Sequence, residues 1–191
     1  GTVIADFEGG FGGAVSTSPF FTIGDNLYED DDVLLIIEGN AITVGDSLCN
    51  ISKNRVASKI VDRYLRFGVE FIGDVSGNFN LVLLDKKRNI LNIYNDKLGF
   101  SYLYYYSGED FFIFSPEIKA ILNHPAIKKT MDLSAVSSFF TSNTIIGNDT
   151  FFERIKLLPP ASILRVSAAG TSLDSRWVPE PCPILERSND E

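Results

Sequence analysis

The sequence has 191 residues, of which 45% are hydrophobic and 22% charged, so it is long enough for one domain with a hydrophobic core. Its net charge of −8 disfavours a nucleic-acid partner, because binding to a phosphate backbone relies on clustered Lys and Arg. No apolar stretch reaches the roughly 20 residues that span a membrane, and two cysteines, Cys49 and Cys182, are too few for a disulfide framework or a metal site. The composition indicates a soluble globular domain, whose simplest location is the cytoplasm.

Strand signals dominate the first two thirds of the chain. The first is a continuous aliphatic run, which is typical of a strand buried on both faces. The next four are rich in apolar and aromatic residues and form two pairs, each joined by a short polar turn, which predicts two antiparallel hairpins. The expected strands comprise residues 33–37, 79–84, 90–94, 102–106 and 111–114.

Helical signals are fewer. In the first, apolar residues recur at spacings of three and four until Gly68, a residue type that commonly follows a helix end. The second has Pro in its first turn and Ser115 as its expected N-cap. The third is expected to be capped by Asp132 or Thr130. The three expected helices cover residues 54–67, 116–122 and 132–140.

Three segments are expected to be irregular. Residues 8–14 (EGGFGGA) lack the G-K-[ST] ending of a phosphate-binding loop, so we predict a flexible loop there. The acidic run at residues 29–32 lacks the ligand spacing of a calcium loop and is interpreted as a solvated loop. Three prolines after Leu173 indicate an extended connector. We therefore expect a domain at residues 1–173 and a linker at residues 174–191.

Short blocks of the chain occur in an informative order. They are Gly68–Gly77 (GVEFIGDVSG), Asn78–Asp85 (NFNLVLLD), Asn95–Gly99 (NDKLG), Phe114–Ala120 (FSPEIKA), Thr150–Ile155 (TFFERI), Leu157–Pro160 (LLPP) and Arg176–Pro179 (RWVP). In this order they resemble the motifs G-x-E-F-L-x-x-L-x-G, M-F-A-F-A-L-Y-D, R-D-[RH]-x-G, F-A-S-E-[IM]-K-A, T-[LI]-F-E-x-I, L-P-P-G and R-Y-W-x-P. These motifs belong to the class II glutamine amidotransferase domain of the asparagine synthetase and β-lactam synthetase family.

The resemblance implies an α+β fold of the N-terminal-nucleophile type, a four-layer α/β/β/α sandwich of two antiparallel sheets. Enzymes of this family use an N-terminal Cys as nucleophile, and its own α-amine acts as the base. Residue 1 is Gly here, and the family's C-G-I-x-G opening places Thr2 at the position of the Cys. Thr2 is thus a candidate nucleophile, but with Gly1 ahead of it Thr2 has no free amine. We favour its interpretation as an ordinary strand residue.

The resemblance also implies an altered oxyanion hole. The family's N-G-E triplet supplies an Asn side-chain donor and a Gly backbone N–H, and its Glu helps to hold the substrate. In this chain the triplet is Glu38-Gly39-Asn40, with the outer residues exchanged. A carboxylate at Glu38 has the wrong sign to stabilise an oxyanion, and the loss of one donor typically lowers the rate about 100-fold to 1,000-fold. Gly39 is equally explained by a turn that needs positive φ. We interpret Glu38, Gly39 and Asn40 as the remnant of a substrate site.

Two further substrate contacts that the resemblance implies are missing. The family's S-D pair, whose Asp binds the substrate amino group, falls at Arg55-Val56, and neither residue can pair with an ammonium. No Arg or Lys occurs in residues 11–32, where the family has an Arg that holds the substrate carboxylate. The histidine, His124, matches a loop position and is interpreted as structural. The turn at Asn95 and Asp96 is also mainly structural in the family.

We therefore expect a glutaminase-like domain that has lost glutamine hydrolysis and serves a structural role. Its partner would be a C-terminal synthetase domain that uses ATP to adenylate a carboxylate and then forms an amide, as in an asparagine-synthase-like ligase. ATP and magnesium are expected only in that domain, because these 191 residues lack its S-G-G-x-D-S motif. Neither a metal site nor a membrane partner is expected, and a homodimer is left open. Two alternatives remain. One is an active amidotransferase domain supplying ammonia for asparagine synthesis, with a natural N-terminus other than Gly1, and the other is a free-standing binding module.

Overall fold

The computed structural model describes residues 2–7, 11–16, 27–44, 47–48, 54–108 and 111–177. Seven of the described strands form one antiparallel sheet in the order β12-β11-β7-β6-β4-β3, with β5 paired to β4. Its two longest strands, β4 and β6, are paired from Val33 opposite Asp85 to Val44 opposite Val75. The strands are β3 (Leu27–Glu29), β4 (Val33–Val44), β5 (Ser47–Leu48), β6 (Val75–Asp85), β7 (Ile90–Asn95), β11 (Ser162–Ser167) and β12 (Gly170–Ser175).

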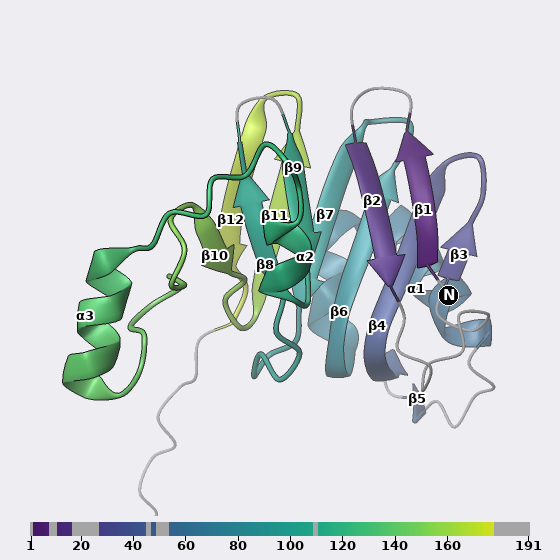
Figure 1. Ribbon diagram of the computed structural model, residues 1–191. Helices are drawn as coiled ribbons and strands as arrows, with labels where there is room; N and C mark the ends of the chain where they lie inside the picture. The colour runs from purple at the N-terminus through teal and green to yellow at the C-terminus, as the bar shows by residue number, and fades with distance from the viewer. Residues whose placement is uncertain are drawn as a thin grey trace, which may run out of the picture.

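A second antiparallel layer lies against one face of this sheet (Figure 1). Three of its described strands pair in the order β10-β8-β9: β8 (Tyr104–Ser107), β9 (Phe112–Ser115) and β10 (Ile155–Leu157). The hairpin of β1 (Thr2–Phe7) and β2 (Phe11–Ser16) continues the layer, because β2 lies beside β9.

Helices cover the outer faces of both layers. Helix α1 (Asn54–Phe67) continues into the 3-10 helix η2 (Gly68–Asp74), and both lie behind the large sheet in Figure 1. The short helix α2 (Ile118–Leu122) lies in front of β8 and β9. Helix α3 (Leu133–Ser142) projects to the side, and Ala135 is its one buried residue. The layers are thus helix, sheet, sheet and helix, which confirms the expected α+β sandwich.

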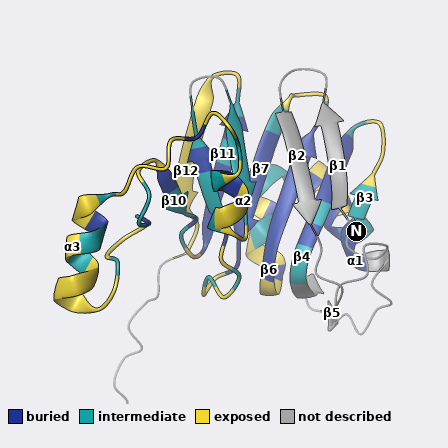
Figure 2. Cartoon of the chain, viewed as in Figure 1, coloured by how far each residue is buried: buried dark blue, intermediate teal, exposed yellow. Residues whose placement is uncertain are grey.

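Three clusters of buried apolar residues lie in the three spaces between the four layers. Figure 2 shows that buried residues run along β4, β6 and β7 of the large sheet. The alternation of side chains along a strand produces this division, because odd-numbered residues of β4 such as Leu35 face α1 and even-numbered residues such as Leu34 face the second layer. The third cluster includes Ile121 of α2 and Ile155 of β10. Full burial of a Leu or Ile side chain contributes about 1.5–3 kcal/mol, so these rows stabilise the stacking of the layers.

Several predicted elements are confirmed. The first helix covers Asn54–Phe67, as its periodicity indicates, and Gly68 follows it with a φ of 60°. Both predicted hairpins form, as β6–β7 and β8–β9. The third predicted helix is capped by Asp132, whose carboxylate accepts hydrogen bonds from the backbone N–H groups of Ser134 and Ala135.

Two predictions are wrong. The second helix begins at Ile118 rather than Pro116, because Glu117 is still extended at φ −123° and ψ 124°, and Glu117 is the N-cap rather than Ser115. The Oγ of Ser115 accepts a hydrogen bond from the Glu117 N–H ahead of the helix. The Gly-rich segment is not a loop throughout, because its residues from Phe11 onward form β2, paired with β1.

Other expectations fall at the edges of elements. Of the acidic run at residues 29–32, Glu29 ends β3 and the other three residues form the turn to β4, where the Asp30 carboxylate accepts the backbone N–H groups of Asp32 and Val33. The domain boundary expected between residues 173 and 174 falls inside β12. Gly1, Cys49 and Cys182 lie outside the described residues. Within the described part of the chain, none of the helices is long and apolar enough to cross a membrane.

Candidate functional site

A row of polar side chains crosses the large sheet on the face that points toward the second layer. Cross-strand pairing gives this face two apolar rows, Leu34–Leu84–Leu91 and Ile36–Val82–Ile93, and then Glu38–Asn80–Asn95. Directly opposed residues on adjacent strands project from the same face with Cβ atoms about 5 Å apart. We call Glu38, Asn80 and Asn95 the polar row; it is where the apolar filling between the two sheets ends.

Gly39 fixes the backbone of β4 next to Glu38. Its φ is 95°, which favours glycine, and a Cβ atom at this position would clash with the backbone carbonyl of Asn78. The positive φ expected at Gly39 is confirmed, but the expected turn is wrong, because Gly39 lies within β4 and pairs with Phe79 of β6. Glycine therefore allows β4 to remain paired with β6 as far as Val44.

Hydrogen bonds fix the orientation of both amides in the polar row. The Nδ2 of Asn80 donates to the Glu38 carboxylate at 3.0 Å, and the Nδ2 of Asn95 donates to the Ser101 carbonyl at 3.1 Å. The Oδ1 atoms of Asn80 and Asn95 are buried, and neither accepts a hydrogen bond from a described residue. Asn80 is 1% exposed and Asn95 is 4% exposed. The row thus presents oxygen acceptors whose donors are missing within the described structure.

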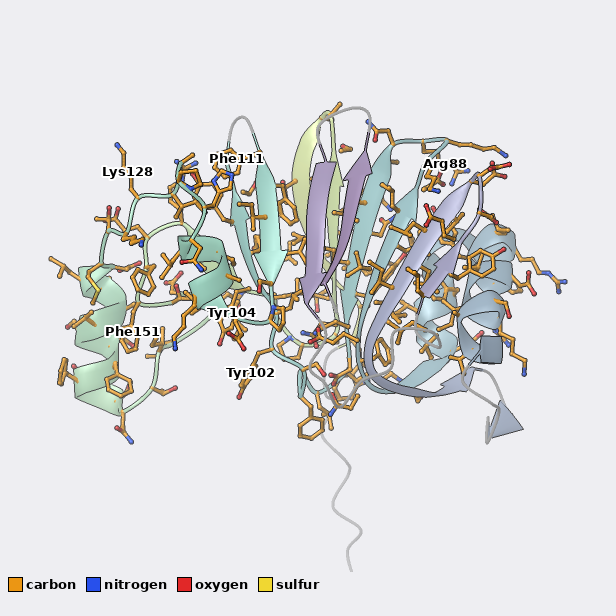
Figure 3. All side chains as sticks on the ribbon, turned by 45° about the vertical axis from the view of Figure 1, so that its right-hand side comes forward. Arg88, Tyr102, Tyr104, Phe111, Lys128 and Phe151 are labelled. Atoms are coloured by element: carbon orange, nitrogen blue, oxygen red, sulfur yellow. The ribbon has the colours of Figure 1, made fainter. Side chains whose placement is uncertain are left out.

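The neighbouring turn is held by Asp96 and has a structural role. Its carboxylate accepts the backbone N–H groups of Leu98, Phe100 and Ser101 at 2.9, 3.4 and 3.4 Å. The Oγ of Ser101 also donates to the Oδ1 of Asn78 at 2.6 Å. Tyr102, at the end of this turn, is 62% exposed and points away from the body of the domain (Figure 3).

Burial raises the pKa of the Glu38 carboxyl group above its ordinary value, and the hydrogen bond from Asn80 partly offsets this rise. The cause is loss of hydration, because a carboxylate beside the space between two sheets has less water around it. Apart from Asn80, none of the described residues donates a hydrogen bond to Glu38, and none forms an ion pair with it. Toward a ligand, the polar row therefore presents hydrogen-bond acceptors.

The other residues singled out from the sequence lie in different places. Val56 is buried in the first turn of α1, on the opposite face of the large sheet from the polar row. Thr2 is the first residue of β1 and lies opposite Ser16. The ring of His124 packs against that of Phe111, with 4.7 Å between the ring centroids.

Sequence reasoning missed Asn80, although a signal for it was present. Asn80 alternates with Val82 and Leu84 in a strand of otherwise apolar residues, so an amide occupies a position where a core side chain is expected. A buried amide in an apolar row requires partners, because an unpaired polar group in the interior is costly.

A sequence model of the glutamine amidotransferase domain family matches residues 54–178. This match covers well over half of the chain. The chain belongs to the glutamine amidotransferase domain family. Its class II, asparagine-synthetase type follows from the relatives described next and from the ordered motifs.

Two relatives from Bacillus subtilis (strain 168) are similar to this amidotransferase domain. Asparagine synthetase [glutamine-hydrolyzing] 3 is 31% identical over 119 residues, which is 62% of this chain and 19% of the relative. Asparagine synthetase [glutamine-hydrolyzing] 2 is 23% identical over 151 residues, 74% of this chain and 20% of the relative. The chain spans about a fifth of the length of these relatives.

All three members of the polar row differ from the amidotransferase motifs. The triplet has Glu38 in place of Asn, the M-F-A-F-A-L-Y-D strand has Asn80 in place of its first Ala, and the R-D-[RH]-x-G turn has Asn95 in place of Arg. The changes lie far apart in the sequence, and the sheet register brings them into one row.

Proposed function

We propose that this glutamine amidotransferase domain does not hydrolyse glutamine and is a structural part of a larger asparagine-synthetase-related protein. The polar row carries this proposal. Hydrolysis of an amide passes through an oxyanion, which has to be stabilised by hydrogen-bond donors. The row offers a carboxylate and two unpaired carbonyl oxygens instead, and these repel a developing negative charge.

Val56 supports the proposal from a second position. The resemblance implies an Asp for the substrate amino group at this position, whereas Val56 packs into the cluster between α1 and the large sheet. A buried Val provides no charge to hold an ammonium. The missing charge at Val56 and the acceptors of the polar row therefore both support the proposal.

A glutaminase assay tests the proposal. We expect the 191-residue chain, and a form shown by mass spectrometry to begin at Thr2, to release no more ammonia from L-glutamine than buffer does. The Bacillus subtilis asparagine synthetase [glutamine-hydrolyzing] 3 serves as the positive control. Enzyme-dependent ammonia release that disappears in Thr2→Ala would overturn the proposal and identify Thr2 as the nucleophile.

The proposed partner is a synthetase region of the same polypeptide that forms an amide with ATP. The support is the difference in length, because this chain matches about a fifth of relatives named as asparagine synthetases. An open reading frame that continues past residue 191 into such a region is the expected result. A stop codon directly after Glu191 would instead favour a free-standing binding module.

A further inference from the structure

We infer that the polar row binds a small cation carrying N–H donors, either an ammonium ion or the protonated amine of a small molecule. Neither the family match nor the relatives assign a ligand to these three residues together. The inference goes beyond the proposed function and does not depend on whether glutamine is hydrolysed. It rests on the acceptor groups that the sheet register brings together at the end of the space between the sheets.

The first step is the count of donors and acceptors. Glu38, Asn80 and Asn95 contribute two carboxylate and two amide oxygens, and their two amide nitrogens already donate to Glu38 and to the Ser101 carbonyl. Both amide oxygens are left without a donor among the described residues. A buried acceptor without a partner typically costs about 1–3 kcal/mol, so a ligand that supplies donors would be stabilised at the row.

The second step is that turning the side-chain amides of Asn80 and Asn95 by 180° would not satisfy the unpaired acceptors. An inverted Asn95 would place its Oδ1 against the Ser101 carbonyl oxygen, and an inverted Asn80 would place its Oδ1 against the Glu38 carboxylate. Both arrangements bring two acceptors together. The hydrogen-bond network therefore fixes the side chains with their oxygens free.

The third step concerns charge. In the described part of the chain no Lys or Arg bonds to the row: the Nε of Arg165 donates to Asn92, whose neighbours in register face α1, and Lys156 pairs with Asp149. The Asp96 carboxylate, next to Asn95 in the chain, is held by backbone N–H groups. The row therefore has a net negative charge, which favours a cation and disfavours an anion.

The fourth step selects the kind of cation. Calcium takes six to eight oxygen ligands, usually from several carboxylates, whereas the row has one carboxylate and the described residues contain no cluster of metal-binding side chains. An ammonium group carries three or four N–H donors pointing in different directions. It can thus donate to Glu38, Asn80 and Asn95 together, and its hydrogen bond to Glu38 would be charge-assisted.

A titration followed by two-dimensional NMR of the side-chain amide groups tests the inference. We expect ammonium chloride and methylammonium chloride to shift the NH₂ signals of Asn80 and Asn95. Sodium chloride and tetramethylammonium chloride at equal concentration, which offer no N–H donor, should leave these signals in place. At ten times the dissociation constant, ammonium should also raise the melting temperature by about 3 °C over sodium.

Matched variants assign the effect to the row. Glu38→Gln keeps the shape of the side chain and should weaken ammonium binding by about tenfold or more, because the charge-assisted hydrogen bond is lost. Asn95→Ala should abolish ammonium binding. Asn92→Ala is the matched control: it removes a buried Asn from the same strand on the opposite face and should leave ammonium binding unchanged. If Asn95→Ala does not fold, the ammonium affinity of Glu38→Gln alone tests whether the polar row is the binding site.

Three results would overturn the inference. The first is the absence of any shift of the NH₂ signals with ammonium, which would mean that water or other protein groups donate to the amide oxygens of the row. The second is an equal shift with sodium or tetramethylammonium, which would show a response to ionic strength or charge alone. The third is undiminished ammonium binding by Glu38→Gln.

Discussion

Glu38 carries a carboxyl group into the space between two sheets, and folding removes part of the water around it. Its pKa is raised, chiefly by this loss of hydration. A carboxyl group with a raised pKa in the folded state binds its proton more tightly when folded than when unfolded. Protonation therefore stabilises the fold, and this contribution is gained as the pH falls through the raised pKa. The ionised form of Glu38 is therefore less favourable for folding than its protonated form.

Glu38→Gln should thus raise the free energy of unfolding at pH 7 by about 1 kcal/mol, because it removes the charge and keeps an acceptor for Asn80. The gain should shrink as the pH falls, because the wild-type carboxyl becomes protonated. Urea unfolding of the wild-type and Glu38→Gln proteins from pH 7 to acidic pH measures the difference in their free energies of unfolding. Asp30→Asn provides a control of opposite sign: backbone N–H groups lower the pKa of Asp30, so its stabilising contribution is present at neutral pH and lost on acidification. A difference for Glu38→Gln that grew on acidification would contradict the expected sign.

The sequence indicated part of the candidate site at this scale. The exchanged triplet identified Glu38 and Gly39, because a motif match compares residues one by one. It left Asn80 unrecognised, and it assigned Asn95 to a structural turn. Their association depends on the register of three strands that are not all neighbours in sequence, and register is a property of the folded sheet.

At the scale of elements, α3 depends on its cap more than on packing. Ala135 is its one buried residue, and Phe140 is 83% exposed. Asp132 accepts two backbone N–H groups of the first turn. Asp132→Ala should therefore lower the stability of this helix by about 1 kcal/mol, measured as faster hydrogen exchange within α3. Ser137→Ala, an exposed change within the same helix, should not accelerate it. Equal effects of the two substitutions would show that the cap is unimportant.

Elements with strong periodicity could be predicted, and those that depend on distant partners could not. Helix α1 and the hairpin β6–β7 carry long, regular apolar patterns. Strand β12 was missed because its side chains are exposed and give no alternation, so that pairing with β11 alone defines it. Strand β2 was read as a loop because glycine disfavours strands, whereas here Gly12 and Gly13 pair with Asp6 and Ala5.

At the scale of the whole molecule, the four layers and the projecting helix should differ in local stability. Strands β6 and β7 lie inside the large sheet and have apolar clusters on both faces, and α1 packs on one of these clusters. Native-state hydrogen exchange should therefore be slowest in β6 and β7, slow in α1, and fast in α3. The comparison of α1 with α3 controls for helix structure itself. Exchange in α3 as slow as in β6 would mean that the helix unfolds only with the whole domain.

The polar row at the end of two apolar rows has a consequence for how such a domain can evolve. Substitutions within the apolar rows would open cavities between the layers and are constrained by folding. Beyond the last apolar row, this constraint is relaxed, and residues there can exchange a donor for an acceptor while the layers stay stacked. Substitutions in the polar row can therefore replace one binding or catalytic property with another while the fold is retained.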